Sequence, residues 1–216
     1  MGDWSNAYKY AEEALVKKDT LEDFKVEGFK LPNHFQSVET INALELTLTS
    51  SYKNAVSVLP SFLAFYEEGD LRPVTYFAPA NDKGNRACLK GGDHNFRNTI
   101  RVAELYLNSA EATAQSDNLS AARRRVLELM EKRYNPEAYA KKKTAVDAMN
   151  KTELVEEILK ERASELAFEG QRWFDLHRTT RPRIEKVLQE KIYVLEQDDS
   201  RYALRIPEEA IASNPT

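Results

Sequence analysis

The sequence has little cysteine, histidine and glycine, and it has no long apolar run. Of its 216 residues, one is cysteine (Cys88), three are histidine and seven are glycine. A single cysteine excludes an intrachain disulfide framework and a Cys-x-x-Cys metal site. No apolar run reaches the roughly 18 residues of a membrane span. The formal net charge of −4 argues against general binding of nucleic acid.

The three histidines are far apart in the sequence. His34, His94 and His177 form neither a His-x-x-x-His nor a His-Glu-x-x-His pattern, so we expect no metal site. Nothing near Cys88 marks an activated nucleophile. The pair Gly91-Gly92 indicates a turn rather than a phosphate-binding loop, so we also expect no cofactor.

The composition favours helices, because alanine, leucine, glutamate, lysine and arginine are common. Residues 3–18 are predicted to form a helix with Asp3 as its N-cap. Its pattern of Trp, Tyr-Ala and Ala-Leu resembles one helix of a tetratricopeptide repeat.

Two further helices are predicted as an antiparallel hairpin, from Thr99 to Ala114 and from Ala121 to Tyr134. Pro136 is expected to end this hairpin. Lys141-Lys142-Lys143 is then expected in a polar connector.

Residues 19–98 give a weaker pattern. The alternation from Ala43 to Thr49 predicts a short strand. Aromatic residues are dense between Tyr52 and Phe77, and prolines interrupt the segment. We expect a long, mostly irregular region, which a compact protein rarely carries without a use for it.

The stretch from Glu161 to Leu176, ERASELAFEGQRWFDL, combines large aromatic residues with charged residues of both signs. The sequence predicts one helix that starts with a capping box at Asn150 and Glu153 and continues through this stretch. At about 100° per residue, two arginines and two glutamates form one row on this helix; they are Arg162, Glu165, Glu169 and Arg172. Opposite charges at these spacings pair, so we expect a structural ion network. Glycine inside a helix costs about 1 kcal/mol relative to alanine, so Gly170 suggests that another backbone approaches closely there.

The two glutamates of this row have a second interpretation, as the acid and base of a glycoside hydrolase. A general acid needs a raised pKa, whereas neighbouring arginines lower the pKa of a carboxyl. We therefore favour the structural network, and we expect no catalytic residues and no enzyme activity.

Five segments resemble the SusD/RagB family in the order in which its members carry them. They are Asp3 to Lys17, Asp70-Leu71-Arg72 with Tyr76-Phe77, Ile100 to Ala112, Glu161 to Leu176, and Ile206 to Pro215. The third matches the family's R-x-A-E-x-Y-L-x-x-A-E-A helix, and the last resembles its terminal I-P-x-x-E-I-x-x-N-P motif. Members of this family are glycan- and nutrient-binding lipoproteins of the Gram-negative outer membrane.

The resemblance implies a mainly α-helical fold, with tetratricopeptide-like helical hairpins and a long irregular loop region. It covers the C-terminal half of a typical member, and the chain starts abruptly in a helix. Residues 1–216 are therefore expected to be a single C-terminal region of a longer protein. Its expected parts are a helix at 3–18, a loop-rich insertion at 19–98, the hairpin and signature helix at 99–178, and a C-terminal tail at 179–216.

The resemblance also implies a function. The chain is expected to belong to a non-catalytic subunit that binds an oligosaccharide or other nutrient and delivers it to a SusC-like TonB-dependent transporter. That subunit would be surface-exposed at the cell outer membrane, held by an N-terminal lipid anchor that lies outside this chain.

Four aromatic residues are the candidates for ligand contact: Tyr52, Phe62, Phe65 and Tyr66. Sugar binding in this family stacks aromatic faces on pyranose rings, and these four fall in an expected loop. Ordinary packing remains the alternative role for each of them. The alternative function is a helical-repeat module that binds a protein partner, and a more distant one is a glycoside hydrolase that uses Glu165 and Glu169.

Overall fold

The computed structural model describes residues 2–45, 57–90, 97–203 and 206–213. The chain divides into two compact units, with Gly2–Glu169 in the first and residues 170–216 in the second. The sequence prediction treated 1–216 as one region with its last internal boundary after residue 178. The structural division falls earlier, inside the signature stretch.

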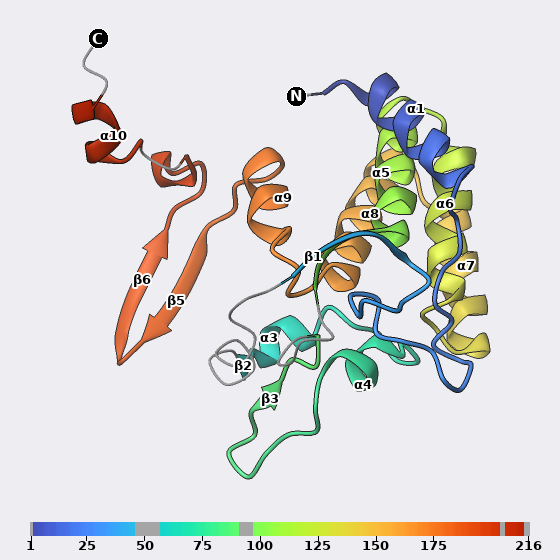
Figure 1. Ribbon diagram of the computed structural model, residues 1–216, viewed down its shortest axis with the longest axis horizontal. Helices are drawn as coiled ribbons and strands as arrows, with labels where there is room; N and C mark the ends of the chain where they lie inside the picture. The colour runs from blue at the N-terminus through green and yellow to red at the C-terminus, as the bar shows by residue number, and fades with distance from the viewer. Residues whose placement is uncertain (1, 46–56, 91–96, 204–205, 214–216) are drawn as a thin grey trace. The chain divides into compact units, whose positions relative to one another are not determined.

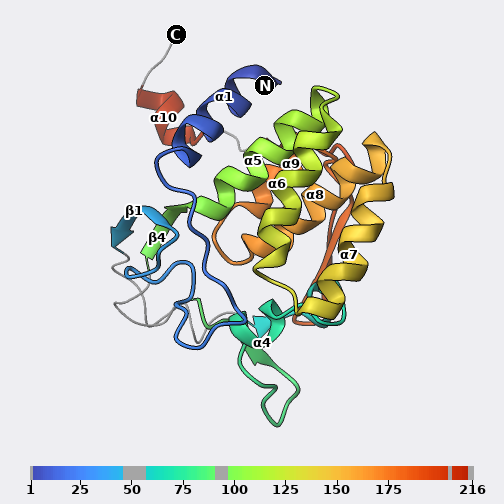
Figure 2. The same ribbon diagram turned by 90° about the vertical axis from the view of Figure 1, so that its right-hand side faces the viewer.

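The five longest helices of the first unit pack side by side (Figures 1 and 2). They are α1 (Trp4–Leu15), α5 (Val102–Gln115), α6 (Leu119–Glu131), α7 (Pro136–Ala148) and α8 (Lys151–Glu165). Helix α5 contacts α1, α6 and α8, and α6 contacts α7 and α8. The fold is therefore mainly α-helical, as predicted.

Local sequence signals explain where these helices begin. The Asp3 carboxylate accepts a hydrogen bond from the backbone N–H of Asn6, so the predicted N-cap of α1 is confirmed. Asn150 and Glu153 form the predicted capping box at the start of α8. Small residues such as Ala103 and Ala110 are fully buried and let α5 approach its neighbours closely.

Three predictions about the helical part are wrong. The helix predicted from Thr99 begins later, at Val102, because residues 97–101 form strand β4 (Arg97–Arg101). The expected connector is helix α7, so Lys141 to Lys143 lie on a helix. Pro136 starts this helix instead of ending its predecessor, because a proline at the first helical position needs no N–H. The side chain of Asn135 caps it by accepting from the N–H of Ala138.

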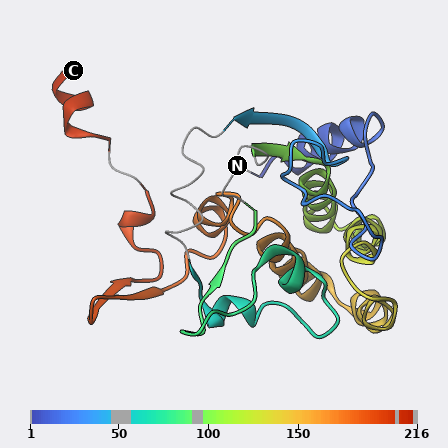
Figure 3. The same cartoon turned by 60° about the horizontal axis from the view of Figure 1, so that its bottom comes forward.

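The loop-rich region contains short elements in its described parts: β1 (Thr40–Glu45), β2 (Ser57–Val58), α3 (Pro60–Leu63), α4 (Arg72–Tyr76) and β3 (Arg86–Ala87). Strand β1 pairs antiparallel with β4, with a bulge between Thr40 and Asn42, and β2 pairs with β3. Figure 3 shows β1 and β4 as neighbouring arrows. The strand predicted from Ala43 starts earlier than expected, and residues 46–49 of that prediction lie outside the described residues.

The signature stretch is not one helix, so that prediction is wrong. Helix α8 ends at Glu165, and α9 (Arg172–Arg178) begins after a turn. Two residues of this turn, Phe168 and Gly170, have positive φ values of 63° and 81°. Gly170 is therefore not inside a helix, and a Cβ atom placed on it would meet nothing within 4 Å. The expected close approach of another backbone is also wrong; glycine is needed there for its backbone conformation.

The second unit contains α9, a hairpin of β5 (Ile184–Leu188) and β6 (Lys191–Leu195), a short 3₁₀ helix η1 (Ser200–Tyr202), and α10 (Glu208–Ser213). The rings of Trp173 and Tyr202 stack at a centroid distance of 5.2 Å. Among the described residues of this unit, Asp175 and Tyr202 are the ones that are buried.

Candidate functional site

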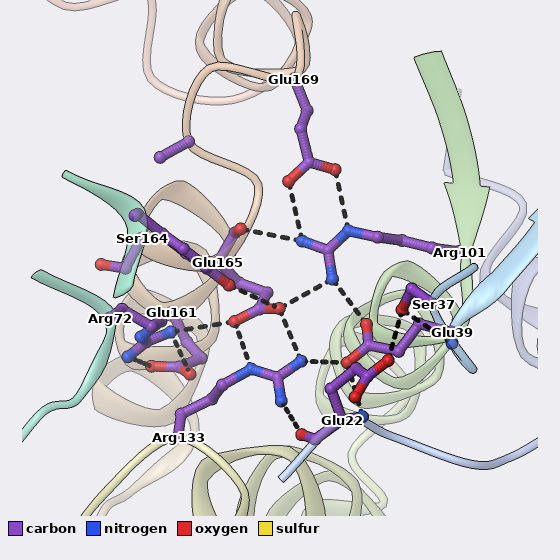
Figure 4. A network of polar contacts seen from close by, with 12 residues as sticks. Glu22, Ser37, Glu39, Arg72, Arg101, Arg133, Glu161, Ser164, Glu165 and Glu169 are labelled. Atoms are coloured by element: carbon purple, nitrogen blue, oxygen red, sulfur yellow. Dashed lines mark hydrogen bonds and ion pairs between the residues drawn. The ribbon is translucent and has the colours of Figure 1, made fainter. Parts of the chain in front are cut away.

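Ten charged residues meet in the first unit, around the C-terminal end of α8 (Figure 4). We call them the buried ion network: Glu22, Glu39, Asp70, Arg72, Lys90, Arg101, Arg133, Glu161, Glu165 and Glu169. Its cations come from α4, from the loop after β3, from the end of β4 and from the turn after α6. None of these four cations is more than 3% exposed. Charges buried to this degree need partners, because desolvation otherwise makes them costly.

Glu165 lies at the centre of the network and is fully buried. Arg133 donates to both of its carboxylate oxygens, each at 2.9 Å. Arg101 Nη1 donates to Oε1 at 2.7 Å. Burial alone would raise the pKa of Glu165, but the charges of Arg133 and Arg101 outweigh it and hold that pKa well below its ordinary value.

Glu169 is bound in the same manner at the edge of the network. Arg101 donates to its two oxygens from Nε at 2.8 Å and from Nη2 at 2.9 Å. Lys90 Nζ donates to Oε1 at 2.6 Å. Burial opposes ionisation, yet these two cations lower the pKa of Glu169 below its ordinary value.

Glu39 and Glu22 tie the segment after α1 to this centre. The Glu39 carboxylate lies between Arg101 Nη1, at 2.8 Å, and Arg133 Nη2, at 2.5 Å. Arg133 Nη1 also donates to the backbone oxygen of Glu22. The Glu22 carboxylate accepts from the hydroxyl of Ser37 at 2.9 Å and from the N–H of Val38 at 3.0 Å. The network therefore fixes the segment after α1, which also packs through the buried ring of Phe24.

Arg72 forms the remaining arm of the network. Its guanidinium binds the Asp70 carboxylate from Nε at 2.9 Å and Nη2 at 2.7 Å, and the Glu161 carboxylate from Nη1 at 2.7 Å. The rings of Tyr66 and Tyr134 lie 5.6 Å and 5.4 Å from the guanidinium carbon. Burial raises the pKa of Glu161, and the charge of Arg72 only partly offsets that effect.

The structure places the four predicted network residues in different surroundings. Glu165 and Glu169 are both ion-paired, with Arg101 common to the two. Arg162 contacts Asn108, at 2.8 Å, and Glu104, at 3.5 Å. Arg172 starts α9, in the second unit.

The sequence argument missed the distant cations of the network. Spacing along a helix reveals only neighbours within about one turn, whereas Arg133, Arg101 and Arg72 precede Glu165 by 32, 64 and 93 residues. One available signal was that the Asp70-Leu71-Arg72 turn and Arg101 both lie in segments that resemble family motifs.

This geometry opposes an acid and base role for Glu165 and Glu169. A general acid must hold a proton near the working pH, and an inverting pair must leave room for a water between its carboxyl groups. Here both carboxylates bind the same guanidinium, and their pKa values are lowered. The arrangement ties chain segments together and favours the ionised form of Glu165 and Glu169.

The candidate ligand-binding aromatics pack against other rings. Phe62 lies 5.5 Å from Phe65 and 5.8 Å from Tyr66 between ring centroids. It also contacts Phe77 and Phe168. The Tyr66 hydroxyl donates to the backbone oxygen of Ser164 at 2.9 Å, and burial raises the pKa of Tyr66. All three candidates are half-buried, and Tyr52 lies outside the described residues.

Two hollows open on the helical part of the first unit. One, of about 490 Å³, is lined by residues that include Glu67, Gly69, Asn135, Lys142 and Glu157. The other, of about 500 Å³, runs between α6 and α7 and is lined by residues that include Arg124, Glu128, Tyr139, Lys143 and Asp147. Within the described ranges, no three His, Cys, Asp or Glu side chains gather in a way that would hold a metal ion.

The SusD family profile matches residues 79–215 of the sequence. The chain belongs to the SusD family. The family predicted from the sequence motifs is thereby confirmed, and the matched range includes six of the ten residues of the buried ion network, from Lys90 to Glu169. A search of curated proteins finds no significant match.

Solved SusD structures share this fold. A SusD superfamily protein from Bacteroides thetaiotaomicron VPI-5482 aligns with a TM-score of 0.72 and 21% identity, over 99% of this chain and 56% of that one. A protein from Bacteroides vulgatus ATCC 8482, described as sugar binding, aligns with a TM-score of 0.71 and 22% identity, over 99% and 54%. A SusD-like carbohydrate binding protein from the same organism gives a TM-score of 0.66 and 19% identity, over 98% and 54%. The chain thus spans about half the length of these SusD structures.

No helix among the described residues of this SusD chain combines the length and the apolar character that crossing a membrane requires.

Proposed function

We propose that this chain is part of a non-catalytic subunit that binds an oligosaccharide and delivers it to a SusC-like TonB-dependent transporter. The observation that carries the proposal is the SusD family match over residues 79–215. It is supported by solved relatives of the same fold that are described as carbohydrate or sugar binding. The family resemblance implies a place at the outer membrane, so we place the whole protein there, held by a lipid anchor.

The state of the charged residues supports a binding role without catalysis. The two carboxylates that resemble a hydrolase pair are ionised and bound by guanidinium groups. A binding protein has no need of a proton donor, and it gains from a rigid framework that holds its ligand contacts in place.

Among the four aromatic candidates, Phe65 is our choice for the ring that stacks on a sugar. Phe62 and Tyr66 both pack against Phe77, and Tyr66 also supports Arg72. The Phe65 ring stacks on Phe62 with an interplanar angle of 29°. We propose that Tyr52 acts with Phe65, since it belongs to the same predicted loop.

Calorimetric titration of the full chain with a panel of oligosaccharides tests this proposal. Phe65→Ala should weaken binding of the saccharide that the parent protein binds by about tenfold or more, because losing one aromatic contact costs about 1–3 kcal/mol. Phe35→Ala is the matched control, since Phe35 is 46% exposed and stacks on His34. Tyr66→Ala is unsuitable because it also removes the hydrogen bond to Ser164. Equal affinity of the Phe65→Ala variant and the parent would exclude this residue from the site.

The two hollows on the helical part favour one rival, a module that binds a protein partner. Their linings are rich in charged side chains of both signs and poor in the aromatic rings on which a pyranose would stack. Absence of affinity for every saccharide of the panel, together with stable capture of a transporter barrel, would support this rival. Release of shortened sugars that disappears in Glu165→Gln would instead support a hydrolase.

A further inference from the structure

The hollow of about 490 Å³ opens beside α7 in the first unit. Its walls come from Glu67 to Gly69, which lie between α3 and α4, from one side of α7, and from Glu157 of α8. None of the ten residues of the buried ion network is among the described residues that line it. Small-molecule sites typically measure about 300–1,000 Å³, so the hollow is large enough to hold a ligand.

Negative charge is in excess on these walls. Four glutamates and two lysines line the hollow, and the glutamates are Glu67, Glu68, Glu137 and Glu157. A third lysine, Lys160, reaches Glu67 without being part of the lining. Even with Lys160 counted, the carboxylates outnumber the ammonium groups, so the hollow attracts a cation.

Glu157 is a wall residue with an unused acceptor atom. Its side chain is 11% exposed, and Lys142 Nζ lies 2.7 Å from its Oε1. No described residue donates a hydrogen bond to its Oε2. A carboxylate oxygen on so little exposed a side chain is costly to leave without a donor. An N–H group of a ligand in the hollow would supply that donor.

Lys142 brings a second carboxylate to the same place. Its Nζ also donates to Glu67 Oε1 at 2.7 Å. Because one nitrogen pairs with both glutamates, the carboxylates of Glu67 and Glu157 lie close together. Burial alone would lower the pKa of Lys142, but the two glutamates outweigh burial and raise that pKa. Lys142 therefore stays charged at neutral pH and keeps both carboxylates in position.

Apolar side chains complete the lining, among them Ala138, Ala145 and Met149. An aliphatic chain that lies beside them loses contact with water, which is favourable. A metal ion fits less well, because it needs several oxygen ligands at once. In the described parts of the chain, no three acidic side chains gather in that way. The hollow therefore suits a cation with a carbon body.

We propose that the hollow binds a small organic cation, a molecule with a primary ammonium group on a short aliphatic body. An ammonium group has three N–H donors, and it would donate to Oε2 of Glu157 and to other carboxylates of the lining. Hydrogen bonds between ionised groups are stronger than those between neutral groups. Phe62, Phe65 and Tyr66 are not among the lining residues, so this proposal does not rest on saccharide binding.

Calorimetric titration with 1,5-diaminopentane tests the site, and 1,5-pentanediol is the uncharged probe of the same length. The parent protein should bind the diamine but not the diol, with an affinity that falls as salt is added. Glu157→Gln should weaken binding of the diamine about tenfold, because it removes a charge-assisted hydrogen bond. Glu156→Gln is the matched control, since Glu156 is the exposed neighbour on α8 and does not line the hollow.

Backbone NMR spectra recorded with the diamine locate the site, and the largest shifts should fall on Gly69, Ala138 and Ala145. Glu68→Gln gives a second variant if Glu157→Gln does not fold, because Glu68 is exposed; it should also weaken binding. Three results would each overturn the proposal. They are absence of binding by the parent, an equal loss of affinity in Glu156→Gln, and binding of a lysine-containing peptide without binding of the diamine.

Discussion

Arg133 and Glu165 form a two-pronged ion pair in which Nε and Nη2 each lie 2.9 Å from a carboxylate oxygen. Neither side chain is exposed. Arg133 follows α6 and Glu165 ends α8, so the pair joins two helices at one fixed separation. A buried pair of this kind contributes little net stability compared with apolar residues, but it is costly to break. Its value to the fold is that few other arrangements satisfy both groups.

Replacing Arg133 by methionine should lower the free energy of unfolding by about 3–5 kcal/mol, because it leaves Glu165 and Glu39 buried with one cation fewer. Chemical denaturation measures this change. Lys141→Ala is the control, since that lysine and its partner Glu137 have side chains that are 76% and 82% exposed, and it should change little. Equal stability of the two variants would show that the pair has no structural role.

Arg162→Ala should destabilise the fold by a smaller amount, about 1–3 kcal/mol, through loss of the hydrogen bond to Asn108 and the ion pair with Glu104. Thermal melting measures the loss, and saccharide affinity of the folded variant should not change. An unchanged melting temperature would contradict a structural role for Arg162.

Stability should fall in acid through Glu165 and Glu169. Their folded pKa values are lowered from the ordinary 4.5, so their stabilisation is present above that value and is lost as the pH falls through the folded pKa values. Glu165→Gln should therefore be destabilised at pH 7 and show a shallower loss of stability below about pH 4.5. Denaturation midpoints measured from pH 3 to pH 7, at roughly unit steps, give both results.

Glu161 provides the contrast for this pH series. Its folded pKa is raised, so its contribution is favourable below the ordinary value and is lost as the pH rises through the folded pKa. Glu161→Gln should thus cost less stability at pH 7 than Glu165→Gln. A larger loss of stability in Glu161→Gln than in Glu165→Gln would mean that the two carboxyl groups have been assigned the wrong protonation states.

Gly69→Ala should destabilise the first unit by about 2–4 kcal/mol, from overpacking and backbone strain together. Gly69 has a φ of +83°, and a Cβ there would clash with Ala138 and lie 2.7 Å from Asn135 Nδ2. Gly84→Ala, with a φ of +75° and no neighbour within 4 Å, isolates the strain and should cost about 1 kcal/mol. A comparable loss in both variants would show that the close contact at Gly69 is relieved cheaply.

Much of the fold was predictable where the signal is local. The Asp3 cap, the capping box of Asn150 and Glu153, and the small-residue face of α5 each depend on residues within a few positions of one another. Helix α7 was missed because its three lysines looked like a solvated connector, although Asn135-Pro136 is a helix start by the same capping logic.

The remaining features depend on partners that are distant in the sequence. The spacing of apolar residues from Glu161 to Leu176 predicts one unbroken helix, but α8 ends at Glu165. Lys90 and Arg101 donate to the backbone oxygens of Glu165 and Ala167 at this point. The charges of Glu165 and Glu169 predicted an ion network. Its main cations come from distant parts of the sequence, so they could be identified only from the tertiary structure.

The most direct test of this account is the titration of the Glu165 carboxyl group by carbon NMR, with Glu165→Gln used to assign its signal. We predict the chemical shift of an ionised carboxylate from neutral pH down to the pH at which the protein unfolds. A titration in the folded protein with a midpoint above the ordinary value of 4.5 would contradict the account, because that carboxyl group would then be free to serve as an acid.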